Sequence, residues 1–348
     1  MARASKLPES SLMYAEAADA PRVVAAQLAG NSDRLARLAT RLREQPPRFV
    51  VTCARGSSDH AATFAKYAIE TQLGLVTASA PPSVTSLYRV TPQLAGALYL
   101  VISQSGESPD LLHCTAAARR AGAQVVAFTS HEHSTLAGLA ELTIPLGAGV
   151  ERSVAATKTF IASLSAILQL LAFWKEDAAL QTALEAVPAA LERAFSLDWS
   201  ALVAGLTRAE HAFVLGRGLM LAAAEEAALK LKETCGLHAE AFSSAEVKHG
   251  PMALIGAGFP VLMFAEKDAA LPDTLETAGA FRARGARVWT ALPGDTHADA
   301  LPLAGAPHPL CAPLLMVQSF YRVANALALA RGRDPDAPPY LRKVTETL

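Results

Sequence analysis

Titratable side chains that can transfer protons are concentrated between residues 230 and 250. They are Lys230, Lys232, Glu233, His238, Glu240, Glu246, Lys248 and His249. Carboxylates, amines and imidazoles at the end of an Ala/Leu-rich helix suit proton transfer on a small polar substrate. The alternative is an amphipathic helix whose charged face is simply solvated, as most charge runs are. The rest of the chain is needed to choose between these interpretations.

A second stretch is rich in uncharged hydrogen-bond donors. The residues Ser103-Gln104-Ser105-Gly106-Glu107-Ser108 follow the apolar run Ala97–Ile102 and precede a helix expected from Pro109. Three hydroxyls and an amide at the start of a helix suit a phosphate monoester. The alternative is a capping box formed by Ser105 or Ser108, but four donors exceed that need and favour anion binding. The turn has neither the Walker nor the Gly-x-Gly-x-x-Gly spacing, which disfavours a nucleotide.

The elements around this turn alternate between strand and helix. We expect strands at 48–53, 97–102, 124–128 and 142–146, and helices at 59–71, 109–121 and 160–174. Residues 10–44 are expected to be helical, with breaks at Pro21 and at Gly30-Asn31-Ser32. This alternation predicts a parallel sheet that is covered by helices on both faces. Open sheets of this kind bind ligands at the carboxyl ends of their strands.

The pattern occurs twice in the chain. Arg217-Gly218 follows Arg55-Gly56 by 162 residues, and Ala223, Ala224 and Ala227 follow Ala61, Ala62 and Ala65 by the same interval. Distant landmarks that keep one interval indicate an internal repeat. Only the first copy carries the serine turn, and only the second carries the cluster from Lys230 to His249.

We therefore predict an α/β protein with two similar, doubly wound, flavodoxin-like parallel-sheet domains in tandem. The predicted domains are residues 32–180, which would bind phosphate, and residues 200–330, which would carry the catalytic Glu and His. A helical extension, residues 1–31, precedes them. A C-terminal tail, residues 331–348, follows them.

Composition excludes several classes of partner. The 348 residues carry a net charge of −1, so no basic field attracts nucleic acid or a membrane surface. The most apolar run, 160–174, is too short and too polar to cross a bilayer. The four cysteines and nine histidines show no metal-ligand spacing. We expect a cytoplasmic protein with a small-molecule substrate, no nucleic-acid or membrane partner and no metal site.

Several of these motifs, in this order, resemble those of the sugar isomerase (SIS) family. The similar stretches are the serine turn, Val154-Ala155-Ala156-Thr157-Lys158, Lys230-Leu231-Lys232-Glu233 through His249-Gly250-Pro251, and the tail from Asp334 to Thr345. The similarity extends over nearly the whole chain. Within the family, the chain looks like the isomerase half of glucosamine-6-phosphate synthase and like stand-alone deaminases.

The resemblance implies a role for each matching residue. Glu233 would move a proton between C1 and C2 of an open-chain sugar, and Lys230 would support the charged intermediates. His249 would assist ring opening, from the neighbouring subunit of a homodimer with shared active sites. Lys343 would form a Schiff base with the ketose carbonyl. The phosphate would be held by Ser103, Gln104, Ser105 and Ser108, and the sugar would be lined by Ser58 and Val154. Such chemistry needs no metal and no other cofactor.

The chain departs from the synthases at two points. Ala156 stands where the synthases usually have serine, so one sugar contact is expected to be missing. The chain begins Met1-Ala2-Arg3, without the cysteine nucleophile of a glutaminase domain, so glutamine is not expected to supply ammonia. The second departure favours an isomerising deaminase that converts glucosamine 6-phosphate to fructose 6-phosphate and ammonia. A fructosamine-6-phosphate deglycase and a non-catalytic sugar-phosphate sensor remain alternatives.

Lys343 has two possible interpretations. A lysine in a proline-rich tail is commonly a solvated residue on a frayed end. The alternative is that Pro338-Pro339 stiffen the tail and that Tyr340-Leu341 pin it against the body. The amine of Lys343 would then reach the sugar.

Overall fold

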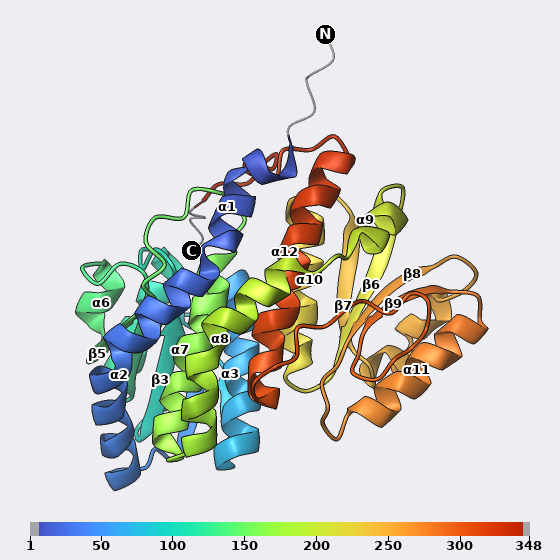
Figure 1. The fold of residues 1–348 in the computed structure, drawn as a ribbon. Coiled ribbons are helices and arrows are strands. Elements are labelled where there is room, and N and C mark those ends of the chain that lie inside the picture. The colour runs from blue at the N-terminus through green and yellow to red at the C-terminus, as the bar shows by residue number, and fades with distance from the viewer. Residues whose placement is uncertain (1–6, 344–348) are drawn as a thin grey trace. The chain divides into compact units, whose positions relative to one another are not determined.

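The computed structural model describes residues 7–343. They form two compact α/β units, each built on one parallel sheet (Figure 1). The first unit contains Arg22–Glu151, Lys158–Ala186 and the residues from Arg342 onward. The second contains the residues up to Pro21, Arg152–Thr157 and Val187–Leu341. The predicted fold class is therefore confirmed. Neither unit is continuous in sequence, in contrast to the predicted domains 32–180 and 200–330.

The sheet of the first unit has five parallel strands in the order β2-β1-β3-β4-β5. Its strands are β1 (Phe49–Cys53), β2 (Thr77–Ser79), β3 (Ala97–Ile102), β4 (Gln124–Thr129) and β5 (Leu142–Pro145). Every residue of β3 is buried, as expected for a central strand covered by helices on both faces. The predicted strands are confirmed, but the short β2 strand was not predicted because three residues give too little pattern.

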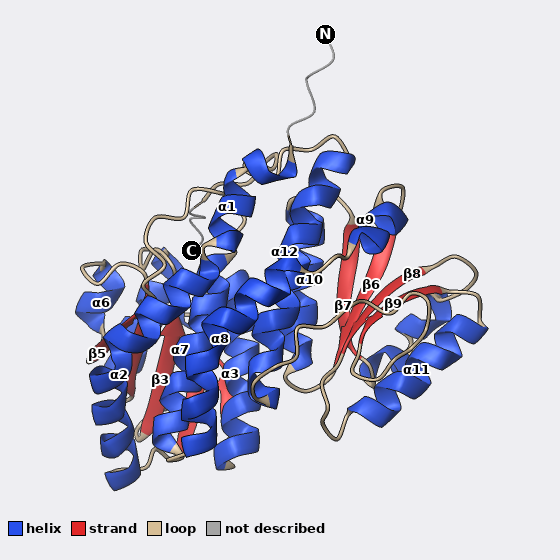
Figure 2. Ribbon diagram, in the orientation of Figure 1, coloured by secondary structure: helices blue, strands red, loops and turns tan. Residues whose placement is uncertain are grey.

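Helices cover this sheet, as Figure 2 shows in blue against the red strands. They are α2 (Ala20–Glu44), α3 (Ser57–Leu73), α4 (Pro82–Ser86), α5 (Pro109–Arg120), α6 (Thr135–Leu139), α7 (Lys158–Trp174) and the first half of α8 (Ala178–Ser196). Nearly all of α7 is buried and it packs on α3, which explains its apolar sequence. No helix among residues 7–343 is long and apolar enough to cross a membrane.

The second unit repeats this topology. Its four parallel strands lie in the order β7-β6-β8-β9, which matches β2-β1-β3-β4 of the first unit. The strands are β6 (His211–Gly216), β7 (His238–Ser243), β8 (Pro260–Phe264) and β9 (Arg287–Ala291). The helices are α1 (Leu12–Ala18), α9 (Ser200–Leu206), α10 (Met220–Glu233), α11 (Leu271–Ala283) and α12 (Ala312–Ala330). The short 3-10 turns are η1 (Pro8–Ser10), η2 (Glu246–His249), η3 (Pro251–Leu254) and η4 (Pro309–Cys311).

The internal repeat also extends to an ion pair that the sequence did not predict. After β1, Arg55 pairs with the buried Asp110 at the start of α5, with a nitrogen–oxygen distance of 2.8 Å. After β6, Arg217 pairs with Asp273 at the start of α11, also at 2.8 Å. In each unit, the ion pair joins the loop after one strand, β1 or β6, to the helix after the strand that lies beside it in the sheet, β3 or β8.

The predicted breaks in the N-terminal helix are only partly right. A break occurs at Asp19, and Pro21 is the second residue of the new helix, where a missing N–H costs nothing. The break predicted at Gly30-Asn31-Ser32 is wrong, because α2 continues through it to Glu44. The side chain of Asn31 instead donates to the Pro145 carbonyl at 2.7 Å. The predicted boundary at residue 31 consequently falls inside α2.

Hydrogen bonds join three distant segments within the second unit. Glu16 on α1 accepts from the backbone N–H groups of Arg152, at 2.5 Å, and Ser153, at 3.1 Å. Asp336 accepts from the N–H of Met13 through its carboxylate, at 2.8 Å, and from the N–H of Val154 through its carbonyl, at 3.2 Å. These bonds explain why residues 152–157 belong with the second unit.

The predicted apolar pin of the tail is wrong. Tyr340 is fully exposed, so its side chain does not pack on the body, and Leu341 is 43% exposed and therefore not buried either. Pro335 and Pro338 are buried instead. The tail is consequently held by these prolines and by Asp336.

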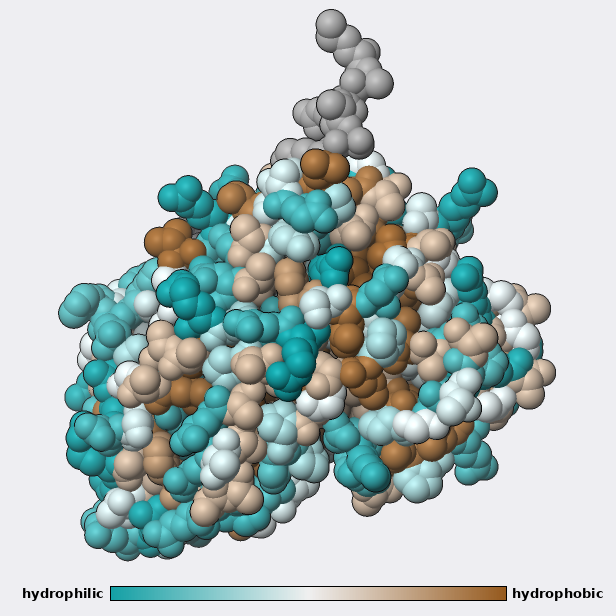
Figure 3. Space-filling model, viewed as in Figure 1, coloured by the Kyte–Doolittle hydropathy of each residue, from teal (hydrophilic) through white to brown (hydrophobic). Residues whose placement is uncertain are grey.

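Figure 3 shows one face of the molecule, on which hydrophobic and hydrophilic residues are intermingled.

Candidate active site

The serine turn lies at the carboxyl edge of the first sheet, between β3 and α5. Gly106 has φ +69°, and a Cβ there would collide with the side chain of Ser134, so the turn needs glycine at this position. The hydroxyl of Ser103 accepts from the N–H of Gly106 at 3.1 Å, and that of Ser105 accepts from the N–H of Glu107 at 3.3 Å. These bonds hold the backbone of the turn.

The capping alternative for this turn is not supported. Ser108 occupies the N-cap position of α5, but its side chain makes no capping hydrogen bond. Glu107 points elsewhere, since its carboxylate accepts from the backbone N–H and the hydroxyl of Thr135, both at 2.8 Å. These bonds lower the pKa of Glu107. The carboxylate of Glu107 is thus bonded at the start of α6. The polar groups that the turn itself presents are the uncharged serine hydroxyls.

Ser58 lies at the same edge of the first sheet as the serine turn. It is in the first turn of α3, directly after β1, and β1 pairs with β3 so that Cys53 faces Val101. Because the carboxyl ends of neighbouring parallel strands meet at one edge, Ser58 and the serine turn belong to one surface of the first unit. Ser58, Gln104, Ser105 and Ser108 are all partly buried, and Ser103 is buried.

Lys343 is paired in the first unit with a carboxylate that the sequence analysis missed. Its Nζ lies 3.2 Å from Oε2 of Glu151, whose side chain is fully buried. The same oxygen accepts from the hydroxyl of Thr159 at 2.9 Å. The side chain of Lys343 is 25% exposed, which is less than a solvated lysine on a frayed end would show. The remaining residues of the tail, 344–348, lie outside the described residues.

The second unit brings Lys230 and Glu233 together on one face of α10. Nζ of Lys230 lies 2.5 Å from Oε2 of Glu233 and 3.4 Å from Oε1 of Glu226. Spacings of three and four residues place all three side chains on the same side of the helix. Burial by itself lowers the pKa of Lys230, but the two carboxylates outweigh it and raise the pKa to about 12. Lys230 is therefore a permanent cation at neutral pH.

Tyr321 on α12 completes this cluster. Its hydroxyl donates to Oε1 of Glu226 at 3.0 Å, and both side chains are fully buried. Glu226 could have been suspected because it lies four residues before Lys230. Tyr321 could not, because nothing in the sequence relates α12 to α10.

His249 lies in the same unit but apart from the Lys230–Glu233 pair. It is exposed at the end of η2 and makes no hydrogen bond or ion pair to either residue within the described part of the chain. Its neighbour Lys248 is fixed by an ion pair with Asp273 at 2.7 Å. The bond from Lys248 is the largest of the effects that lower the pKa of Asp273. Val154 is partly buried, and its N–H is bonded to Asp336.

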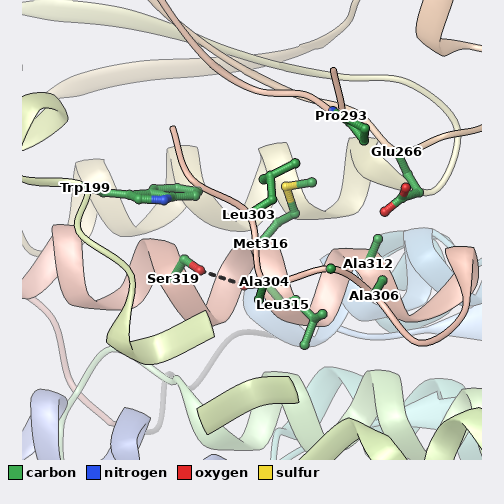
Figure 4. A pocket seen from close by; sticks show the side chains of 11 residues that line it. Trp199, Glu266, Pro293, Leu303, Ala304, Ala306, Ala312, Leu315, Met316 and Ser319 are labelled. Atoms are coloured by element: carbon green, nitrogen blue, oxygen red, sulfur yellow. Dashed lines mark hydrogen bonds between the residues drawn. The ribbon is translucent and has the colours of Figure 1, made fainter. Parts of the chain in front are cut away.

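The second unit also contains a largely apolar pocket of about 230 Å³ (Figure 4). Trp199, Leu303, Leu315 and Met316 line it, and Glu266, directly after β8, adds a carboxylate. None of the predicted site residues lines this pocket.

All four cysteines are free and buried, and burial raises the pKa of Cys235 to about 11 and that of Cys311 to about 12. These two thiols therefore stay protonated at neutral pH. Within residues 7–343 there is no group of three or more His, Cys, Asp or Glu side chains that could hold a metal ion.

The model of the SIS domain family matches residues 42–173 and 205–293, one segment in each repeat. The chain belongs to the SIS family. Its two SIS segments coincide with the two sheets, and together they cover more than half of the chain.

Other SIS proteins resemble the chain over most of its length. A structure from Silicibacter pomeroyi, described as a candidate phosphosugar isomerase, is 46% identical, with a TM-score of 0.90, 94% of this chain covered and 100% of that one. The C-terminal domain of glucosamine-fructose-6-phosphate aminotransferase from Francisella tularensis is 25% identical, with a TM-score of 0.84 and coverages of 94% and 98%.

A curated SIS relative is longer than the chain. The glutamine–fructose-6-phosphate aminotransferase (isomerizing) of Aeropyrum pernix is 35% identical over 98% of this chain and 58% of its own length. The chain thus spans a little over half of this relative.

Proposed function

We propose that the protein is an aminosugar-6-phosphate deaminase and isomerase, which converts glucosamine 6-phosphate and water to fructose 6-phosphate and ammonia. The observation that carries the proposal is the carboxylate of Glu233, 21% exposed, beside the buried ammonium of Lys230. A carboxylate at the end of a helix, reachable by a ligand and held by a fixed cation, is suited to accept and return a proton.

The proposed reaction is a proton transfer followed by hydrolysis. Glu233 takes the proton from C2 of the open-chain aldehyde, which gives an enolamine. The aldehyde oxygen takes up a proton and becomes the C1 hydroxyl of this enolamine. Glu233 then returns its proton to C1 and the nitrogen loses one proton, which gives an imine at C2. Water adds to this imine, and the C2–N bond breaks to release ammonia and leave the ketone. The atoms balance without an oxidant or a reductant.

The other residues have supporting roles in this proposal. The hydroxyls of Ser103, Ser105 and Ser108, the amide of Gln104 and the start of α5 bind the phosphate. Ser58 and Val154 contact the sugar. His249 of the partner subunit assists ring opening, and its exposed position on η2 is compatible with that role.

In this proposal Lys343 also reacts reversibly with the ketone of the product: its nitrogen bonds to C2, the carbonyl oxygen leaves as water, and hydrolysis of this Schiff base restores the ketone. The amine of Lys343 must lose a proton before it can attack the carbonyl. The carboxylate of Glu151, 3.2 Å away, is placed to hold the amine and to accept that proton.

Aldose–ketose isomerisation of a phosphosugar without an amino group is a second candidate. The 46% identity to the Silicibacter pomeroyi structure favours it. The same base would then move a proton between C1 and C2, and no nitrogen would leave. The two candidates differ only in the group at C2.

A substrate panel separates these functions. Ammonia release and fructose 6-phosphate formation are measured with glucosamine 6-phosphate, galactosamine 6-phosphate and fructosamine 6-phosphate, and isomerisation with glucose 6-phosphate. We expect ammonia from glucosamine 6-phosphate, but much less from unphosphorylated glucosamine. Isomerisation without ammonia release supports the second candidate. Cleavage of fructosamine 6-phosphate alone identifies a deglycase. Binding without turnover of any sugar phosphate identifies a sensor.

A further inference from the structure

The cluster on α10 leads from the core of the second unit to its surface. Tyr321, Glu226 and Lys230 have no exposed side-chain area, whereas the side chain of Glu233 is 21% exposed. Each group bonds to the next, with distances of 3.0, 3.4 and 2.5 Å along the series. We call these four residues the relay.

Stability is a weak explanation for the buried members of the relay. Charges are costly to remove from water, and buried ion pairs can often be replaced by apolar residues without loss of stability. The helices α10 and α12 are in contact, and both also carry fully buried apolar residues, among them Ala227, Leu231 and Ala324. A buried ion pair at this contact therefore calls for a reason other than packing.

The geometry indicates what Glu226 does to Lys230. With two carboxylates around one ammonium, Lys230 is shared between Glu226 and Glu233 and stays charged. Without the carboxylate of Glu226, the ammonium of Lys230 would have only Glu233 of these two partners. The carboxylate of Glu233 would then be held more tightly against Lys230 and would be less available to a substrate. Tyr321 holds the oxygen of Glu226 that faces Lys230.

We propose that Glu226 and Tyr321 are positioning residues that act through Lys230 on the carboxylate of Glu233. This inference rests on the proposed function, since Glu226 and Tyr321 would position the base of that reaction, Glu233. Neither residue touches the substrate in this scheme. Their loss should therefore slow proton transfer and leave binding of the sugar phosphate nearly unchanged.

The test measures proton transfer separately from ammonia release. Wild-type protein and variants are incubated with fructose 6-phosphate in deuterium oxide, and incorporation of deuterium at C1 is followed by NMR. We expect Glu226→Gln to lower the saturated exchange rate about ten-fold or more, as weakening a general base does, with KM changed less than about three-fold. Tyr321→Phe keeps every charge and should lower the rate by about three- to ten-fold.

Two controls separate the relay from a general loss of stability. Tyr99→Phe removes another buried tyrosine hydroxyl, from β3 in the first unit, and Glu276→Gln removes an exposed carboxylate from α11. Neither should change the exchange rate. Thermal unfolding is measured for all variants. Because breaking a buried ion pair is destabilising, Tyr321→Phe carries the test if Glu226→Gln does not fold.

A double variant decides whether Tyr321 acts through Glu226. If it does, adding Tyr321→Phe to Glu226→Gln should cause no further loss of rate, whereas independent effects would multiply. If the wild type exchanges the proton and Tyr321→Phe exchanges it at the same rate, this inference is wrong, whereas the proposed function stands. A wild-type protein that exchanges no proton in any phosphosugar of the panel overturns both.

Discussion

The individual side chains of the candidate site divide into uncharged donors and paired charges. In the first unit, hydroxyls line the edge of the sheet, and Glu107 is turned away to bond with Thr135. The charged groups are each matched: Lys343 with Glu151, and Lys230 with Glu226 and Glu233. An anion would meet donors at the serine turn, and proton transfer would be confined to Glu233 and the paired amines.

Replacing Ser105 tests the proposed phosphate site. Ser105→Ala should raise KM for the phosphorylated sugar with a smaller change in kcat, because a hydrogen bond to a charged group is worth about 1.5–3 kcal/mol, or roughly 10- to 150-fold in affinity. Steady-state kinetics measure the effect. Ser196→Ala, on the exposed part of α8, is the control and should change neither constant. Equal turnover of glucosamine and its phosphate by the wild type would show that the turn is not the anion site.

Lys343 can be examined by trapping its adduct. Borohydride reduction in the presence of fructose 6-phosphate should leave a covalent adduct on Lys343, detected by mass spectrometry of peptides. Glu151→Gln keeps the size of the partner but removes its charge, so adduct formation should fall about ten-fold or more, as loss of a proton acceptor does. Lys175, an exposed lysine on the same unit, serves as the internal control and should stay unmodified. An adduct on both lysines would mean nonspecific glycation.

At the scale of elements, the polar residues of the candidate site lie at the ends of helices. In the first unit the serine turn lies between β3 and α5 and Ser58 lies in the first turn of α3, whereas in the second unit Glu233 is the last residue of α10. Turns at such positions depend on backbone conformations that few residues allow. The serine turn depends on Gly106 in this way, with φ +69° and Ser134 against it.

Gly106→Ala should therefore disturb the serine turn. The left-handed conformation costs an alanine about 1–2 kcal/mol, and the collision with Ser134 adds to it. We expect a lower free energy of unfolding and weaker binding of the phosphosugar, measured by chemical denaturation and by titration. Gly138→Ala is the matched control, since that glycine lies in α6 with open space around it. The free energy of unfolding of the Gly138→Ala variant should be unchanged or slightly increased. Similar losses in both variants would contradict this account.

At the scale of the whole molecule, the chain is a duplication whose halves have diverged. Both repeats keep the strand order and the Arg–Asp pair, but only the first has the serine turn and only the second has the relay. Divergence of this kind gives two units of one fold different chemical tasks. In the proposed homodimer each active site would also be shared between two subunits, because His249 of the partner subunit would complete it.

Mixing two inactive variants tests the proposed homodimer. In a mixed dimer of Glu233→Gln and His249→Ala, one site has both an intact Glu233 and an intact His249. Random exchange makes half of the dimers mixed, so about a quarter of the wild-type activity should return. Subunit exchange is verified by mass spectrometry with one labelled variant. No recovery after verified exchange would place His249 in the site of its own subunit or outside catalysis.

The sequence by itself determined the strand–helix order, the repeat and the serine turn. Those features depend on local patterns: β-branched runs such as Phe49–Cys53, the interval between Arg55 and Arg217, and hydroxyls before Pro109. It also drew attention to the titratable cluster from Lys230 to His249, and the resemblance to the SIS family singled out Lys230 and Glu233 within it. The break predicted at Gly30 failed because glycine lowers helix propensity only slightly, and packing outweighs it.

Only the tertiary structure decided which partners the charged groups have. Tyr321 meets Glu226 across 95 residues of sequence, and Lys343 meets Glu151 across 192. Such pairs are created when helices pack and loops close, and no periodicity in the chain records them. The exposure of Tyr340 and the burial of Pro335 and Pro338 were likewise decided by the fold, because the tail is held by backbone bonds to Asp336. Local patterns determine elements, but the partners of a buried charge depend on packing.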